Sequence, residues 1–131
     1  MAAVVAQGVR EHQDGRLDIL GIYPGVRVNA VPYVAPEIRL FISFSANQAE
    51  VGEEKVVQVH LLAADGELMR RAQATVTVPD PPRPGSRADF NVNFPLTDVP
   101  FVQAGDYGFH ILVESVEKTV PFYISLEEGQ P

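Results

Sequence analysis

Histidine side chains can bind metal ions and can transfer protons near neutral pH, and the chain has three histidines. They are His12, His60 and His110. His60 and His110 fall on the outward phase of predicted strands, whereas His12 lies in a predicted turn. A metal site requires ligands that converge, so two of these histidines would have to meet from separate elements. We expect ordinary solvent-facing histidines and no metal site. A metal-assisted enzyme that uses them stays as a third hypothesis.

Aspartates in predicted loops could form an oxygen cage for calcium, as they do in calcium-dependent β-sandwiches. The chain has no Asp-x-Asp spacing, and its two Asp-Gly pairs, at 14–15 and 65–66, are typical of tight turns. We therefore expect turn chemistry instead of a calcium site. The loop aspartates concerned are Asp14, Asp65, Asp80, Asp98 and Asp106.

Nucleophilic and general acid–base catalysis have no matching motif. No serine lies in a Gly-x-Ser-x-Gly elbow, and no glycine-rich phosphate loop is present. The paired carboxylates Glu53-Glu54 and Glu127-Glu128 are neighbours in a loop and in the tail, where solvation is more typical than a fixed catalytic separation. The sequence predicts a protein that is not an enzyme and has no cofactor.

Charge and composition narrow the possible partners. The chain has 131 residues, and its 10 basic and 17 acidic residues give a formal net charge of −7. Without a cluster of Lys and Arg, nucleic acid and anionic membranes are poor partners, and acidity favours solubility. The chain has no cysteine, its N-terminus does not resemble a signal peptide, and no apolar run would span a bilayer. We expect a cytoplasmic protein.

Alternation of apolar and polar residues is the strongest structural signal. It predicts a β-hairpin at 105–126, and further strands at 2–8, 16–23, 26–29, 38–45, 55–62, 68–78 and 89–96. Segment 97–104 is expected to be a loop. The inward residues of the hairpin are Tyr107, Phe109, Ile111 and Val113 in one strand and Val120, Phe122, Ile124 and Leu126 in the other.

Proline-rich segments separate these strands and indicate the architecture. Proline lacks a ladder donor, so the segments at 24–36 and 79–84 are expected at sheet edges or at crossings between sheets. Eight or nine short strands without an amphipathic helix favour an all-β, antiparallel two-sheet β-sandwich with Greek-key, immunoglobulin-like connections. A closed barrel is the alternative. We predict one domain at 1–126 and a polar tail at 127–131.

A family resemblance rests on the segment Gly15-Arg16-Leu17-Asp18-Ile19-Leu20-Gly21-Ile22-Tyr23, followed by Val31-Pro32 and Ile38-Arg39-Leu40-Phe41-Ile42. In this pattern the chain resembles an uncharacterised family of small bacterial all-β proteins, a domain of unknown function. The later Gly105-Asp106-Tyr107 is similar to the start of a penultimate strand in immunoglobulin-like sandwiches. The resemblance implies a bacterial or phage source and a sandwich fold, and it supplies no catalytic residue.

Recognition of a protein partner is the remaining function. Arg39 and Phe41 share the outward phase of one strand, and aromatic residues with arginine are typical of interfaces. The alternative is that flanking proline segments cover Phe41. We predict a non-catalytic binding or structural module that acts through protein–protein contacts, with itself as the simplest partner through edge strand 26–29 or 90–94. A small-ligand or carbohydrate module that uses Tyr23, Tyr33 and Phe101 is the second hypothesis. The predicted interface residues are Arg39, Phe41, Tyr23, Tyr33 and Tyr123.

Overall fold

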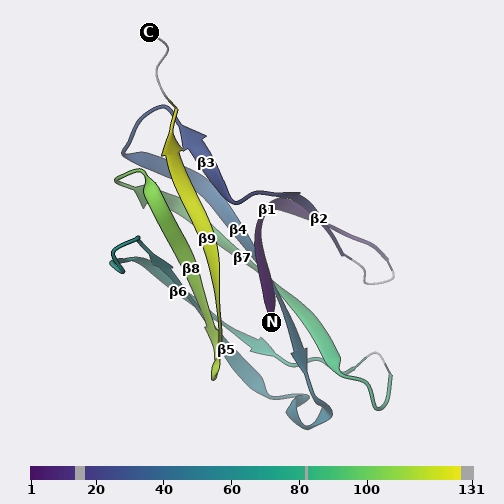
Figure 1. Cartoon of the computed structure of the whole chain (residues 1–131). Coiled ribbons are helices and arrows are strands. Elements are labelled where there is room, and N and C mark those ends of the chain that lie inside the picture. Colours follow the sequence, from purple (N-terminus) through teal and green to yellow (C-terminus); the bar gives the residue numbers. More distant parts are fainter. Residues whose placement is uncertain (14–16, 82, 128–131) are drawn as a thin grey trace.

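The protein folds as an all-β sandwich (Figure 1). A computed structural model describes residues 1–13, 17–81 and 83–127. The expected turn at Asp14-Gly15 and the tail after Glu127 lie outside these residues. The strands are β1 (Ala2–Glu11), β2 (Leu17–Ile22), β3 (Gly25–Val28), β4 (Tyr33–Ala46), β5 (Glu54–Leu62), β6 (Leu68–Thr77), β7 (Ala88–Phe101), β8 (Gly105–Val113) and β9 (Val116–Leu126), and the short 3-10 helix η1 spans Gln48–Glu50.

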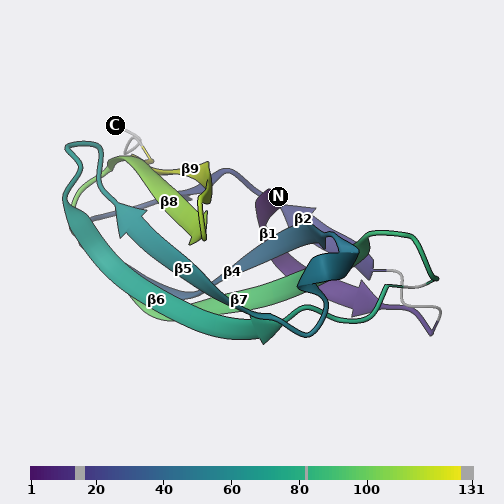
Figure 2. The same cartoon turned by 90° about the horizontal axis from the view of Figure 1, so that it is seen from below.

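The strands form two sheets, which Figure 2 shows as two layers. Sheet A has the order β2-β1-β4-β7 and sheet B has the order β3-β9-β8-β5-β6. The chain crosses between the sheets at both proline-rich connections, from β3 to β4 and from β6 to β7, as the prolines predict. All-antiparallel pairing is wrong at one place, because β3 runs parallel to β9. The chain enters β3 from β2 of sheet A, and no hairpin joins β3 to β9. The antiparallel direction that a hairpin imposes is therefore not required.

The core between the sheets is built from the alternating residues of the central strands. Phe101, Phe109 and Phe122 are at most 1% exposed. The ring of Phe122 lies 5.6 Å from that of Phe109 and 5.9 Å from that of Phe101, centroid to centroid. The predicted inward phases of the strands within 38–45, 55–62 and 105–113 are confirmed. Leu126 is an exception at 47% exposed, because it ends β9 beyond the core.

A shared irregularity in β4 and β7 changes the predicted phase of both strands. Their register is constant over the whole ladder, from Tyr33 opposite Phe101 to Ala46 opposite Ala88. At one level, however, each strand has two successive exposed residues, Pro36-Glu37 and Thr97-Asp98, and Asp98 has a φ of 51°. Beyond this level Tyr33 and Phe101 take the inward phase. The expected loop at 97–104 is therefore wrong, since β7 continues to Phe101.

Candidate functional site

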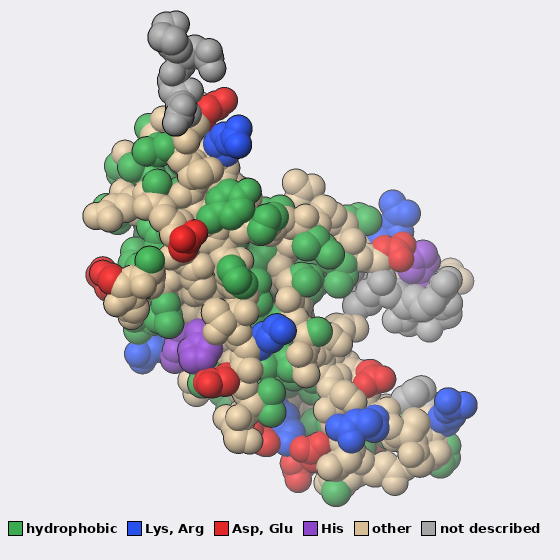
Figure 3. Space-filling view, in the orientation of Figure 1, with side chains coloured by type: hydrophobic (Ala, Val, Ile, Leu, Met, Phe, Trp, Pro, Cys, Tyr) green, Lys and Arg blue, Asp and Glu red, His purple; other side chains and the backbone are tan. Residues whose placement is uncertain are grey.

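The first two strands form a projection from the sandwich. β1 pairs with β4 only through Ala2–Ala6, while residues 8–11 of β1 pair with β2 alone. We call residues 8–11 and β2 the arm. Figure 1 shows β2 leading away from the other strands, and Figure 3 shows the arm standing out with a hollow beside it. The backbone N–H of Tyr23 donates to the carbonyl of Val5 at 3.0 Å and fixes the base of the arm.

The arm carries exposed aliphatic side chains on both of its faces. Ile19, Leu20 and Ile22 are 41%, 43% and 61% exposed. Successive strand residues point to opposite faces, so Ile19 lies on one face and the other two on the other face. The single charged residue of β2 is Asp18, whose carboxylate Oδ2 is 2.7 Å from Nε2 of His12. β2 therefore offers a strand edge with apolar side chains and with its one charge already partnered.

The other edges of the two sheets are protected. β3 has only four residues, and β6 points Arg71, Gln73, Thr75 and Thr77 to solvent. Short edge strands and polar side chains both discourage pairing with another chain. β7 contains Pro95 and Pro100, which have no N–H to donate. Of the edge strands in the described part of the chain, β2 alone combines an apolar surface with a proline-free ladder.

An arginine closes the sandwich at the β7 edge. Arg70 lies in the inward phase of β6, opposite the buried Leu61. Its Nη1 donates to the carbonyl of Thr97, and its Nη2 donates to the carbonyl of Asp98 at 3.1 Å. These carbonyls belong to the irregular level of β7, where the facing Pro36 has no N–H for the ladder. Arg70 thus links the outer strands of the two sheets and occupies acceptors that another strand would need.

The predicted interface residues do not form one surface. Arg39 and Phe41 lie on the outer face of sheet A, and Tyr123 lies on the outer face of sheet B, 40% exposed, with Gly25 against its ring. Nε of Arg39 donates to Oε1 of Glu37 at 3.0 Å. Phe41 is 6% exposed, as the alternative of a covered Phe41 predicts, so it is not an exposed interface residue. β4 is central at this point, so side chains from β1 and β7 flank the ring on both sides.

Tyr23 and Tyr33 lie near each other but are half-buried. The ring of Tyr23 meets Phe122 edge-on, with centroids 5.9 Å apart. Burial raises the pKa of the Tyr23 hydroxyl, and the neighbouring Tyr33 and Glu37 raise that pKa further. The expectation of Phe101 as an exposed loop aromatic is wrong, since it is 0% exposed. The carbohydrate hypothesis keeps two of its three rings, both partly covered.

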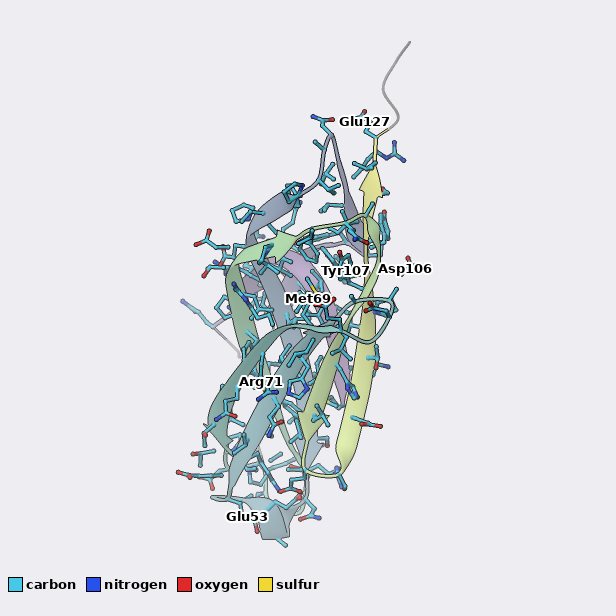
Figure 4. The ribbon with its side chains drawn as sticks, turned by 90° about the vertical axis from the view of Figure 1, so that its left-hand side faces the viewer. Glu53, Met69, Arg71, Asp106, Tyr107 and Glu127 are labelled. Carbon is cyan, nitrogen blue, oxygen red and sulfur yellow. The ribbon has the colours of Figure 1, made fainter. Side chains whose placement is uncertain are left out.

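Lys55 is a buried cation that the sequence reasoning did not single out. It occupies the inward phase of β5 and is 6% exposed. Its Nζ lies 2.7 Å from Glu114, 3.1 Å from Glu50 and 3.3 Å from Glu53. These carboxylates raise the pKa of the Lys55 amine, chiefly through the Glu114 contact. The cluster closes one end of the sandwich, and Glu53 marks this end in Figure 4.

The Glu50 carboxylate has an unusual environment within this cluster. The backbone N–H of Asn47 donates to Oε2 of Glu50 at 2.8 Å, and Lys55 donates to its Oε1. The Asn47 hydrogen bond and then the Lys55 contact hold the pKa of Glu50 below its ordinary value of 4.5. The cluster is an ion-pair network that stabilises the loop between β4 and β5.

An open hollow of about 360 Å³ lies between the loop that joins β5 to β6 and the loop that joins β7 to β8. Met69 and Tyr107 form part of its wall and Asp106 lies at its rim (Figure 4). The Tyr107 hydroxyl donates to the carbonyl of Gln103 at 2.6 Å. Asp65 also lines the hollow, but its carboxylate accepts the N–H of Glu67 at 2.9 Å. In the residues described here, no group of three or more His, Cys, Asp or Glu is arranged to hold a metal ion.

Comparisons with known proteins give one matching family and a solved structure with a low similarity. A family described as "Family of unknown function (DUF6941)" matches residues 1–125. No curated protein matches the chain. A crystal structure of a glycosyl hydrolase family 2 member from Bacteroides cellulosilyticus is similar with a TM-score of 0.39 and 11% identity, over 71% of this chain and 14% of that chain. The described part of this chain has no helix long and apolar enough to cross a membrane.

Proposed function

The chain belongs to the family of unknown function DUF6941, and we propose that it is a non-catalytic binding module that makes protein–protein contacts through the β2 edge of its arm. The observation that carries this proposal is the exposure of Ile19, Leu20 and Ile22 on an outer strand. Exposed edge strands are templates for pairing with a further strand. The absence of a nucleophile elbow or phosphate loop from the sequence supports the non-catalytic part.

The partner that fits this edge is a second copy of the chain. Antiparallel pairing of β2 with β2 of another copy has a two-fold axis, so the same residues are buried on both sides. The strand Leu17–Ile22 has one charge, Asp18, and His12 already partners it. A register centred on Leu20 places Asp18 opposite Ile22 of the other copy and brings no two carboxylates face to face. The two copies of sheet A would then form one continuous sheet.

The size of the contact sets its expected strength. β2 has six residues, which is less than the 20–30 residues a side of a standard interface. Copies of net charge −7 also repel each other at low ionic strength. We therefore expect a reversible dimer that forms at about 10–100 µM and is strengthened by salt.

Sedimentation equilibrium between about 1 µM and 1 mM protein tests this self-association. The variant Leu20→Lys places a charge at the centre of the new ladder, where it meets the same charge of the other copy across the two-fold axis, and should keep the protein monomeric. Val116→Lys is the matched control, because Val116 is 51% exposed at the start of β9, away from the arm. Its dimerisation should equal that of the wild type.

Two outcomes would contradict the proposal. One is a wild-type protein that stays monomeric over the whole concentration range. The other is a dimer that Val116→Lys disrupts as strongly as Leu20→Lys does, which would place the contact elsewhere. Faster hydrogen exchange of β2 amides on dilution would supply independent support.

A further inference from the structure

Two of the three histidines come together on the outer face of sheet B. His60 of β5 and His110 of β8 are directly opposite each other in the antiparallel register. Both are half-buried. Figure 3 shows one purple patch on the body of the sandwich and a separate one on the arm, where His12 lies. This pair meets the requirement for a metal site that two histidines converge from separate elements.

Directly opposite residues of an antiparallel ladder have Cβ atoms about 4.5–5.5 Å apart and point to the same face. Two imidazoles at this separation can bind one ion as a chelate. Imidazole nitrogen suits Zn²⁺, Ni²⁺ and Cu²⁺ and does not suit Ca²⁺ or Mg²⁺, which prefer oxygen. The residue types and their register therefore indicate a transition-metal ion of intermediate hardness, such as Zn²⁺, Ni²⁺ or Cu²⁺.

A carboxylate orients one of the two rings. Oε2 of Glu117, on β9, lies 3.1 Å from Nε2 of His110. A carboxylate that accepts the N–H of one ring nitrogen leaves the lone pair on the other, and this arrangement is common behind metal-bound histidines. In the tautomer whose Nε2–H donates to Glu117, Nδ1 of His110 carries the lone pair that could bind an ion.

We propose that His60 and His110 form a two-histidine site for a divalent transition ion such as Zn²⁺, with Glu117 as the positioning residue and water completing the coordination. Thr119 of β9 lies opposite His110 in the ladder and Arg71 of β6 lies opposite His60. The Arg71 cation weakens the site electrostatically. Two ligands and a nearby cation predict micromolar affinity, well below that of a four-ligand structural zinc site.

Isothermal titration of the full, untagged chain with zinc chloride tests the site. His60→Ala and His110→Ala should each weaken zinc binding by about ten-fold or more, because each removes one arm of the chelate. His12→Ala is the matched control and should bind zinc as the wild type does. Glu117→Gln should weaken binding by about ten-fold, since the ring of His110 loses its carboxylate. The imidazole signals of His60 and His110 should shift together in the NMR spectrum as zinc is added.

The result that would overturn the site is a wild type that binds zinc no more tightly than the double variant His60→Ala/His110→Ala. An equal loss in His12→Ala would also overturn it, by placing the ion on the arm. Thermal unfolding of each variant, compared with the wild type, separates loss of the fold from loss of the ligand. The zinc titration is independent of dimer formation when it is repeated on the monomeric Leu20→Lys protein.

Discussion

β7 and β2 are the two outer strands of the same sheet, and they meet solvent in opposite ways. β7 pairs with β4 along its whole length, carries two prolines, and has the carbonyls of Thr97 and Asp98 occupied by Arg70. β2 pairs with a single strand and leaves Ile22 61% exposed. One edge belongs to the body, which stabilises the fold. The other belongs to the arm, which is available for contact.

The physical difference between body and arm is the number of layers that cover each residue. A residue in the body has neighbours in its own sheet and in the opposite sheet, whereas the arm beyond Ala6 is a two-stranded ribbon. Isolated two-stranded ribbons are marginally stable in water. Substitutions in the body should therefore change the free energy of unfolding, and substitutions in the arm should change association.

The largest expected effect is on the body. Phe109→Ala removes a fully buried ring that contacts Phe122, and should lower the free energy of unfolding by about 3–5 kcal/mol through cavity formation. Urea unfolding followed by circular dichroism measures it. Leu20→Ala on the arm is the counterpart and should change stability by less than about 0.5 kcal/mol. Equal losses in the two variants would remove the distinction between body and arm.

The protected edge is tested by Arg70→Met, which keeps much of the length of the side chain but removes its donors. Leaving the carbonyls of Thr97 and Asp98 without these hydrogen bonds should cost about 1–3 kcal/mol and should also promote aggregation through β7. Unfolding measurements and light scattering follow the two effects. Arg71→Met, at the neighbouring solvent-facing position, should be close to neutral. A neutral Arg70→Met would show that β7 does not need this protection.

The pH dependence of stability tests the ion-pair end of the body. The folded-state pKa of Glu50 lies below its ordinary value of 4.5, so its contribution is present above pH 4.5 and is lost as the pH falls through the folded value. Glu50→Gln should make the loss of stability in acid shallower. The raised pKa of Lys55 has the opposite sign, and its contribution is lost only in strong alkali. Unfolding curves between about pH 2 and pH 7 measure the acid limb.

Glu54→Gln is the control for this titration, since Glu54 is exposed at the start of β5. An acid limb that is as steep in Glu50→Gln as in the wild type would mean that the cluster around Lys55 does not control acid stability.

The smallest expected effect on stability is at the unprotected edge. Ile22→Lys should change the free energy of unfolding by less than about 0.5 kcal/mol, because the side chain is already mostly solvated. Ile22→Asp, which places a carboxylate opposite Asp18 of the other copy, should leave stability equally unchanged but weaken self-association strongly. A large loss of stability would show that Ile22 is part of the body, and the comparison between β7 and β2 would fail.

Much of the sandwich could be predicted from local alternation. Segments 26–29 and 90–94 do lie on edge strands, β3 and β7, as their prolines and brevity indicated. The same alternation places Lys55 on the inward face with Val57. The three glutamates that contact Lys55 lie close to strand ends in the sequence, so a buried ion-pair cluster could have been predicted there. The phase of Phe101 could not be predicted, because Pro36 and Asp98 disturb two strands at the same level and only the ladder shows that they are opposite.

Strand content and the buried face of each central strand follow from the local sequence pattern, because both depend on the side-chain period of two along a single segment. Three further features are visible only in the folded protein: the strand that lies outermost, the histidine that faces another histidine, and the carbonyls that Arg70 reaches. They depend on the pairing of segments that are far apart in the chain: His60 opposite His110, and Arg70 beside Thr97 and Asp98. β2 reads from the sequence as an ordinary hairpin strand, and only its position in the sheet makes it an edge.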